Sequence, residues 1–307
     1  MKVFAGRRVS ASICGMKGNV GHWLKATRPA TLPAGAAPVL LGTALARADG
    51  FWLPSAALIC LGFALLAQVG SNFANDYLDG IRGTDGPERL GPERAVGAGL
   101  ITPEAMRRAA LLTLGAAFLL GLALIAYGGW WLLVVGLVCV SAAWCYTGGP
   151  YPLAYHGWGD VAVVFFFGIV AVLCSYYVQA GGASWDALLL GLGSGFLTNN
   201  ILVVNNYRDL EADRAAGKRT LLVRLGRDFG RMLAYFSASL AASVVVWLWM
   251  RGYGVGVLLA LLPCGWSFIL SRGLRRTSGR AAFGVALGNA GRVVALYGIL
   301  LALGISL

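Results

Sequence analysis

The sequence predicts an all-α polytopic membrane protein with nine transmembrane helices. It is 58% hydrophobic and only 12% charged, with a mean hydropathy of +0.71, whereas soluble domains carry about a quarter charged residues. Its apolar stretches are each close to the ~17–25 residues that cross a bilayer. Because lipid offers the backbone no hydrogen-bond partners, stretches of this length must be helices. The nine spans are residues 30–47, 54–74, 107–126, 130–146, 159–178, 186–206, 232–250, 253–271 and 284–305.

The chain has 44 glycines, and small residues allow membrane helices to pack closely. The GLGSG segment at 191–195 has glycines like those of a nucleotide-binding loop, but no strand precedes it, so helix packing is the better interpretation. We expect residues 16–307 to form a single domain. Residues 1–15 are basic and lack an apolar core, which predicts a disordered tail rather than a secretory signal.

The formal net charge is +12, and most basic residues lie before the first span or in alternate loops. The positive-inside rule places those segments in the cytoplasm. Nine spans then put the C-terminus outside. We expect the protein to lie in the inner (plasma) membrane of the cell. Topology accounts for the basic character, and the sequence shows no nucleic-acid motif, so we expect no nucleic-acid partner. The six cysteines form no CxxC pair and five lie in apolar spans, which favours core packing over disulfides or zinc.

Two acidic clusters follow apolar spans, at residues 75–85 and 205–220. Ionisable groups at such positions are costly and are candidates for function. Helical spacing puts Asn and Asp side chains on one stripe at the end of each span. The first stripe holds Asn72, Asn75, Asp76 and Asp79, and the second holds Asn205, Asp209 and Asp213.

Carboxylate and amide oxygens suit Mg²⁺, which also binds substrate phosphates. Two facing stripes would hold Mg²⁺ against a diphosphate. The alternative is that both clusters are solvated helix ends, but the similar spacing of the two clusters favours the metal site. Basic residues beside the clusters would donate to phosphate oxygens, or they serve only topology. The predicted metal ligands are Asn75, Asp76, Asp79, Asn205, Asp209 and Asp213, and the neighbouring basic residues are Arg82, Arg89, Arg94, Arg208, Lys218 and Arg219.

Several longer segments carry a resemblance. They are WLKATRPATLPAGAAPVLLGTAL (23–45), SNFANDYLDGIRGTD (71–85), RLGPERAVGAGLIT (89–102), YTGGPYPLAYHGWGD (146–160) and VNNYRDLEADRAAGKRTLLVRLG (204–226). With them the chain resembles the UbiA superfamily of intramembrane aromatic prenyltransferases. Within it, the chain is most similar to the branch that acts on 1,4-dihydroxy-2-naphthoate in menaquinone biosynthesis.

The resemblance implies nine helices around a central cavity open to lipid, with cytoplasmic cap loops after helices 2 and 6. It implies Mg²⁺-dependent transfer of a polyprenyl group from polyprenyl diphosphate to 1,4-dihydroxy-2-naphthoate, releasing CO₂ and diphosphate and giving demethylmenaquinone. Membrane lipid is the surrounding partner. The implied catalytic carboxylates are Asp76, Asp79, Asp209 and Asp213. The implied substrate-binding residues are Arg28, Asn72, Arg94, Tyr146, Tyr155, Asn206, Arg208 and Lys218.

Aromatic faces can stabilise an allylic cation, and Tyr146, Tyr151 and Tyr155 are candidates. For the last two, an interfacial aromatic belt is the alternative. The chain departs from the superfamily pattern at Gly83, where the last Asp is expected, and Asp85 follows two residues later, as in the naphthoate branch. Asp160 stands where that branch often has Glu.

Two other functions remain open. One is prenyl transfer to another aromatic acceptor, 4-hydroxybenzoate or homogentisate, because the Asp clusters do not select the ring. The other is transport, which intramembrane polar clusters also mark. A transporter should have polar residues near mid-span and inverted repeats, whereas here the charges gather at span ends and no repeat is evident.

Overall fold

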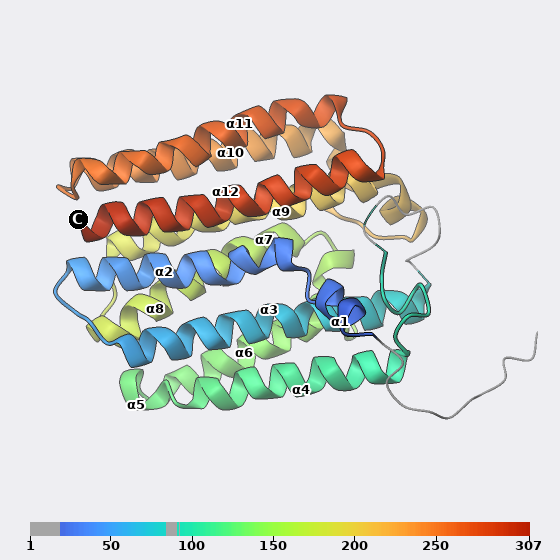
Figure 1. Ribbon diagram of the computed structural model, residues 1–307, viewed down its shortest axis with the longest axis horizontal. Coiled ribbons are helices and arrows are strands. Elements are labelled where there is room, and N and C mark those ends of the chain that lie inside the picture. The colour runs from blue at the N-terminus through green and yellow to red at the C-terminus, as the bar shows by residue number, and fades with distance from the viewer. Residues whose placement is uncertain (1–18, 84–90, 92) are drawn as a thin grey trace, which may run out of the picture.

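The computed structural model describes residues 19–83, 91 and 93–307, and within them it contains helices and no strand. Figure 1 shows long helices lying side by side along a common axis. The predicted N-terminal tail (1–15) and the cluster residues Asp85 and Arg89 lie outside the described residues.

The elements follow one another along the chain, and the longest stretch between two of them, residues 83–102, separates α3 from α4. Their bounds are α1 (Val20–Ala26), η1 (Pro29–Thr31), α2 (Leu32–Ala48), α3 (Pro54–Arg82), α4 (Pro103–Leu122), α5 (Ile125–Gly128), α6 (Trp131–Cys145), η2 (Leu153–Tyr155), α7 (Gly159–Val163), η3 (Val164–Val170), α8 (Ala171–Ala180), α9 (Trp185–Ala215), α10 (Leu221–Met250), η4 (Val255–Ala260), α11 (Leu261–Gly273), η5 (Leu274–Arg276) and α12 (Arg280–Ser306). The η3 segment is a π-helix, continuous with α7 and α8.

Eight helical stretches of the described chain are long and apolar enough to cross a membrane. The remaining predicted span, 130–146, corresponds to α6, which has 15 residues. A helix of that length covers only ~22 Å, less than the ~30 Å hydrocarbon core. The all-α prediction is therefore confirmed for the described residues, and the chain is a multi-pass integral membrane protein.

The two helices that carry the acidic clusters, α3 and α9, are among the longest, with 29 and 31 residues. Pro54 at the first position starts α3, and Gly83 in the left-handed conformation (φ 69°) ends it. Both helices run toward the right of Figure 1, so their C-terminal ends lie at the same end of the bundle. That end carries the predicted site.

Glycines in α9 bring it against the η3 π-helix. A Cβ added to Gly195 would lie 2.7 Å from the carbonyl oxygen of Val164, so only glycine allows this approach. The GLGSG segment is thus a helix-packing surface, as predicted, and it holds α9 beside the segment that carries Asp160.

Large apolar side chains cover much of the outer surface. Leu112 and Val255 are each 74% exposed, and four clusters of buried apolar residues lie between the helices. Exposed apolar surface of this extent suits contact with lipid rather than water.

Candidate active site

A polar cavity lies where the C-terminal ends of α3 and α9 meet the loops that follow them. It brings together most of the side chains that the sequence predicts as site residues. Ten of them line it: Arg28, Asn75, Asp79, Arg94, Tyr146, Asn205, Asn206, Asp209, Asp213 and Lys218. The other four, Asn72, Asp76, Tyr155 and Arg208, do not line this cavity.

Asp79 is the most heavily contacted carboxylate on the α3 side. The hydroxyl of Tyr155 donates to its Oδ1 at 2.9 Å, and Lys218 Nζ lies 3.4 Å from the same oxygen. Arg94 Nη2 lies 4.0 Å from Oδ2. Asp79 is only 4% exposed, so these groups compensate a charge that is nearly removed from water.

On the α9 side, Arg208 holds Asp209 with a fork of two bonds, Nε to Oδ1 at 2.7 Å and Nη2 to Oδ2 at 2.6 Å. Charge-assisted pairs of this geometry are strong and directional. The third nitrogen of the group, Nη1 of Arg208, is buried and has no hydrogen-bond partner among the described residues. The guanidinium therefore keeps donor capacity for a further acceptor.

Lys218 connects the two helix ends. Its ammonium lies 3.6 Å from Asp213 Oδ1 on α9 as well as 3.4 Å from Asp79 on α3, and it stands 4.9 Å from the centre of the Tyr155 ring. A single positive group thus bridges carboxylates from the two acidic clusters. The clusters face each other, as their matched spacing predicts.

Asp76 contacts the chain beyond α3 instead of the polar cavity. Its two oxygens accept hydrogen bonds from the amides of Ala95 and Val96, at 3.2 and 3.0 Å. The residue is 2% exposed and lies beside a second cavity, the basic cavity, which Lys25, Arg28, Arg94 and Arg208 also line. Its role as a magnesium ligand stays a prediction.

Asn72 and Arg28 position the segment that leads into α2. The amide of Asn72 donates to Thr27 O at 2.9 Å and to Thr31 Oγ1 at 3.2 Å, while Arg28 Nη2 donates to Asn72 O. Arg28 has φ 53° and ψ 69°, a left-handed conformation that is uncommon for a residue other than glycine. Such strain is concentrated at functional sites, and Arg28 lines both the polar and the basic cavity.

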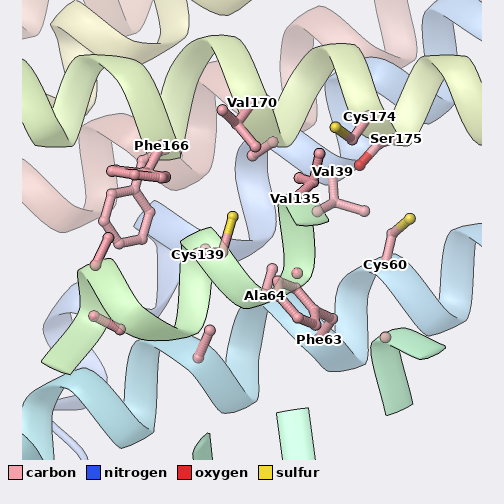
Figure 2. A pocket seen from close by; sticks show the side chains of 18 of the residues that line it. Val39, Cys60, Phe63, Ala64, Val135, Cys139, Phe166, Val170, Cys174 and Ser175 are labelled. Carbon is pink, nitrogen blue, oxygen red and sulfur yellow. The ribbon is translucent and has the colours of Figure 1, made fainter. Parts of the chain in front are cut away.

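An apolar cavity adjoins the polar one inside the bundle. Figure 2 shows side chains from different helices around it, among them Phe63 of α3, Cys139 of α6 and Phe166 of η3. Tyr146 lines both this cavity and the polar cavity. The Tyr146 hydroxyl can donate a hydrogen bond where the two cavities meet.

The described cysteines are free, as predicted: Cys60, Cys139, Cys145, Cys174 and Cys264. Tyr151 was predicted as a candidate ring for stabilising the allylic cation. In the structure it is 54% exposed and stacks on His156, with ring centres 3.7 Å apart. Neither residue lines the polar or the apolar cavity.

Sequence reasoning did not single out Thr147 or Thr220, which also line the polar cavity. The hydroxyl of Thr147 donates to Asn75 Oδ1 at 2.6 Å and so orients that amide. A threonine directly after an apolar span and before two glycines was the available signal, but only the tertiary contact identifies its partner.

The donor set of the polar cavity fits Mg²⁺ by its chemistry. Its described lining offers carboxylate and amide oxygens and contains no cysteine or histidine, and hard oxygen ligands are those that Mg²⁺ prefers. No three His, Cys, Asp or Glu side chains of the described chain are grouped closely enough to form a metal site by themselves. The ammonium of Lys218 shows that the pair Asp79 and Asp213 accommodates a cation between them.

The sequence model of the UbiA prenyltransferase family matches residues 36–303 of the chain. The chain belongs to this family. Within it, the chain is 45% identical over 216 residues to the 1,4-dihydroxy-2-naphthoate octaprenyltransferase of Mycobacterium tuberculosis, covering 69% of this chain and 72% of that protein. It is 38% identical over 255 residues to the enzyme of the same name from Escherichia coli, covering 81% and 80%.

Solved structures of UbiA homologues share the fold. One from Archaeoglobus fulgidus, bound to DMAPP and Mg²⁺, aligns with a TM-score of 0.65 at 14% identity, over 93% of this chain and 99% of that one. The apo structure of a homologue from Aeropyrum pernix K1 aligns with a TM-score of 0.67 at 13% identity, over 89% and 96%. At such identities the likeness establishes the UbiA fold for this chain.

Proposed function

We propose that this protein transfers a polyprenyl group from polyprenyl diphosphate to 1,4-dihydroxy-2-naphthoate, releasing CO₂ and diphosphate and giving a prenylated diol, the reduced form of demethylmenaquinone. The observation that carries this proposal is the polar cavity, in which two acidic helix ends face each other beside an apolar cavity. The naphthoate enzymes of Mycobacterium tuberculosis and Escherichia coli support the choice of acceptor.

The two cavities match the two parts of a prenyl diphosphate. The diphosphate belongs in the polar cavity, where Lys218 and Arg94 can donate to its oxygens. The prenyl tail belongs among the apolar residues of the adjoining cavity and in the lipid around it. The bond that breaks then lies near Tyr146, which lines both.

The proposed metal ligands are Asn75, Asp76, Asp79, Asn205, Asp209 and Asp213. The hard-oxygen chemistry of the polar cavity supports five of them, and Asp76, which lies beside the basic cavity, rests on the family resemblance. When bound, Mg²⁺ neutralises charge that develops on the leaving diphosphate. Thr147 orients the amide of Asn75, and Tyr155 orients Asp79. Arg208 holds Asp209 in place and, through Nη1, retains a donor.

Residues around the junction of the cavities would handle the organic part of the reaction. Tyr146 lies where the two cavities meet, next to the proposed position of the allylic carbon, and an aromatic face stabilises a cation. Arg28 lines the same cavity and can pair with the carboxylate of the aromatic acid. Asn72 supports Arg28 from behind, by accepting its hydrogen bond. Asn206 completes the lining.

The finer architecture is also part of the proposal. We place α6 as a ninth, short membrane span, residues 16–307 in one domain, and the loops after α3 and α9 as caps over the site. The contacts of Asp76 with Ala95 and Val96 support the first cap, since they draw the loop after α3 back onto the helix. The site would open to the cytoplasm of a cell whose inner (plasma) membrane holds the protein, with the C-terminus outside.

The direct experiment uses membranes containing the protein, Mg²⁺, radiolabelled polyprenyl diphosphate and a panel of aromatic acids. We expect prenylated 1,4-dihydroxy-2-naphthoate with release of CO₂, loss of turnover with chelator, and recovery with added Mg²⁺. 4-Hydroxybenzoate should be about tenfold poorer, because its single ring buries less apolar area. An equal or higher kcat/KM with 4-hydroxybenzoate or homogentisate would show that 1,4-dihydroxy-2-naphthoate is not the preferred acceptor. The assignment to the UbiA family would still hold. Uptake of a solute without prenyl transfer would instead indicate a transporter.

Orientation can be tested by labelling single cysteines in a variant that lacks the native ones. Cysteines near Arg94 and Arg219 should react only from the cytoplasmic side, and one near Gly252 should react only from outside. Labelling of the Arg94 and Gly252 positions from the same side would overturn the proposed topology.

A further inference from the structure

Among the described residues, Asp160 is a carboxylate of the polar cavity that has no cationic partner. Four aspartates line this cavity, and three of them, Asp79, Asp209 and Asp213, have an arginine or lysine within 4.0 Å. Asp160 forms no ion pair within the described chain. Its contact is Asn199, whose Nδ2 donates to Oδ1 at 3.0 Å.

The position of Asp160 makes this difference informative. The residue lies in the first turn of α7, is 6% exposed, and sits at the start of a membrane-crossing stretch. A buried carboxylate without a counter-charge destabilises a fold, so its presence here indicates a functional role. The diphosphate site does not supply one, because an additional anion without a cation would repel a diphosphate.

Asp160 stands close to the point where the prenyl group would be transferred. Tyr146 lines both cavities and so marks the reacting carbon of the prenyl chain. A Cβ added to Gly159, the residue before Asp160, would lie 3.0 Å from the Tyr146 hydroxyl oxygen. An acceptor ring must come within ~3–3.5 Å of the reacting carbon, which brings its substituents within reach of Asp160.

Charge decides which edge of the acceptor faces Asp160. Arg28 lines the same cavity and attracts the carboxylate of an aromatic acid, whereas Asp160 repels it. A hydroxyl group is the complementary partner of Asp160, because it donates a hydrogen bond to a carboxylate oxygen. Arg28 and Asp160 would therefore orient a hydroxylated aromatic acid between them.

We propose that Asp160, positioned by Asn199, is a catalytic residue that binds a ring hydroxyl of the aromatic acceptor and accepts its proton. This inference rests on the proposed prenyl transfer. The hydroxyl O–H bond breaks, its proton passes to an Asp160 oxygen, and the electron pair left on oxygen increases the electron density of the ring. A ring carbon then bonds to the allylic carbon while the carbon–oxygen bond to diphosphate breaks, its electron pair leaving with the diphosphate.

The proton balance requires that Asp160 return the proton that it accepts from the acceptor hydroxyl. When the prenyl group bonds to the ring carbon that bears the carboxylate, the deprotonated hydroxyl oxygen becomes a ketone oxygen. Loss of CO₂ leaves the bonding electron pair in the ring and restores the phenolate, which recovers the proton from Asp160. The aromatic acid anion and prenyl diphosphate thus give prenylated diol, CO₂ and diphosphate with no net gain or loss of protons.

The test compares Asp160→Asn and Asp160→Glu with the wild-type protein. Asp160→Asn keeps the shape but cannot accept the proton, and we expect kcat to fall about 10²–10⁴-fold, the usual contribution of a general base. The KM for prenyl diphosphate and its equilibrium binding with Mg²⁺ should change by less than about threefold, because Asp160 does not act on the diphosphate. Asp160→Glu retains the carboxylate and should recover activity to within about tenfold of wild type.

Asp186→Asn is the matched control. Asp186 is also 6% exposed, but its partners are Trp247, Arg251 and Tyr253, away from the polar cavity. This control should leave kcat per folded protein unchanged, with folded amounts measured by thermal unfolding in detergent.

Three results would overturn the inference: a kcat for Asp160→Asn within about threefold of wild type, an equal loss in prenyl diphosphate binding, or a folded Asp160→Glu as inactive as Asp160→Asn. If Asp160→Asn fails to fold, the folded Asp160→Glu and its kcat decide. A wild-type protein that does not prenylate the naphthoate would instead reject the proposed function itself. Wild-type turnover with normal Asp160 variants would reject only the role of Asp160.

Discussion

At the end of α3 the polar side chains mainly contact connecting segments from other parts of the chain, whereas at the end of α9 the aspartates contact cations. Asp76 accepts from the amides of Ala95 and Val96, and Asn75 accepts from Thr147. Asp209 and Asp213 pair with Arg208 and Lys218. Two stripes of similar composition therefore have different surroundings. The α3 stripe orders the loops around the site, and the α9 stripe holds positive charge next to it.

Asp79 is the exception on α3, since it pairs with Lys218 and Arg94 from outside its own helix. It joins the two stripes into one site. Substitutions can remove a loop contact of α3 or a charge contact of α9 separately. They test whether the two helix ends have different roles in the enzyme.

The largest effect is expected for Asp79→Asn and Asp209→Asn. Each removes a charged oxygen ligand, and we expect kcat/KM to fall about 10³-fold or more. Each variant should remain folded because the amide keeps the shape of the side chain. Steady-state kinetics with a Mg²⁺ titration, alongside thermal unfolding in detergent, measure both effects. Near-normal turnover in either variant would contradict its assignment as a metal ligand.

Lys218→Met should have the next largest effect, because one ammonium bridges Asp79 and Asp213. We expect kcat/KM for prenyl diphosphate to fall about 10–100-fold, as charge-assisted bonds to phosphate are lost. The control is Arg214→Met, on the exposed face of α9 and paired with Glu211, which should stay within about twofold. If both variants behave alike, the bridge between the helix ends has no role in catalysis.

Asp76→Asn should act on stability more than Asp79→Asn does. The Asn side chain has one acceptor where two amides donate, so one buried amide loses its partner at about 1–3 kcal/mol. Thermal unfolding of the two variants side by side measures the difference. An unchanged unfolding temperature for Asp76→Asn, together with lost Mg²⁺ response, would make Asp76 a metal ligand and not a loop anchor.

Tyr155→Phe should have the smallest effect. It removes the hydroxyl that donates to Asp79 but keeps the ring beside Lys218. The loss of one hydrogen bond to a charged group, about 1.5 kcal/mol, corresponds to roughly a tenfold lower kcat/KM. A drop as large as that of Asp79→Asn would mean that Tyr155 does more than orient the carboxylate.

Hydrophobic patterning made most of the architecture predictable. Every predicted span has a helical counterpart in the structure, since a backbone in lipid must form its own hydrogen bonds. The 130–146 span is represented by the short helix α6, because Gly129 (φ 89°) interrupts the helix before it and Tyr146 begins the turns that lead to the site. Patterning indicates apolar segments, but local backbone breaks decide their lengths.

Helical spacing likewise predicted two stripes, one of Asn72, Asn75, Asp76 and Asp79 and one of Asn205, Asp209 and Asp213. Five of these seven residues line the polar cavity, whereas Asn72 and Asp76 do not. Spacing cannot show what a side chain meets across space. Asp76 lies one position from Asn75, and that step of about 100° turns it toward the loop after α3.

The sequence by itself determined the membrane class of this protein, its helices and the two opposed acidic clusters, because these follow from hydropathy and from periods within one helix. Only the tertiary structure decided the partners: Lys218 lies between two helices, Tyr146 lies where two cavities meet, and Asp160 pairs with Asn199. These depend on how segments far apart in the chain pack together. The chemistry of a buried charge depends on those neighbours, so the role of each carboxylate depends on the fold.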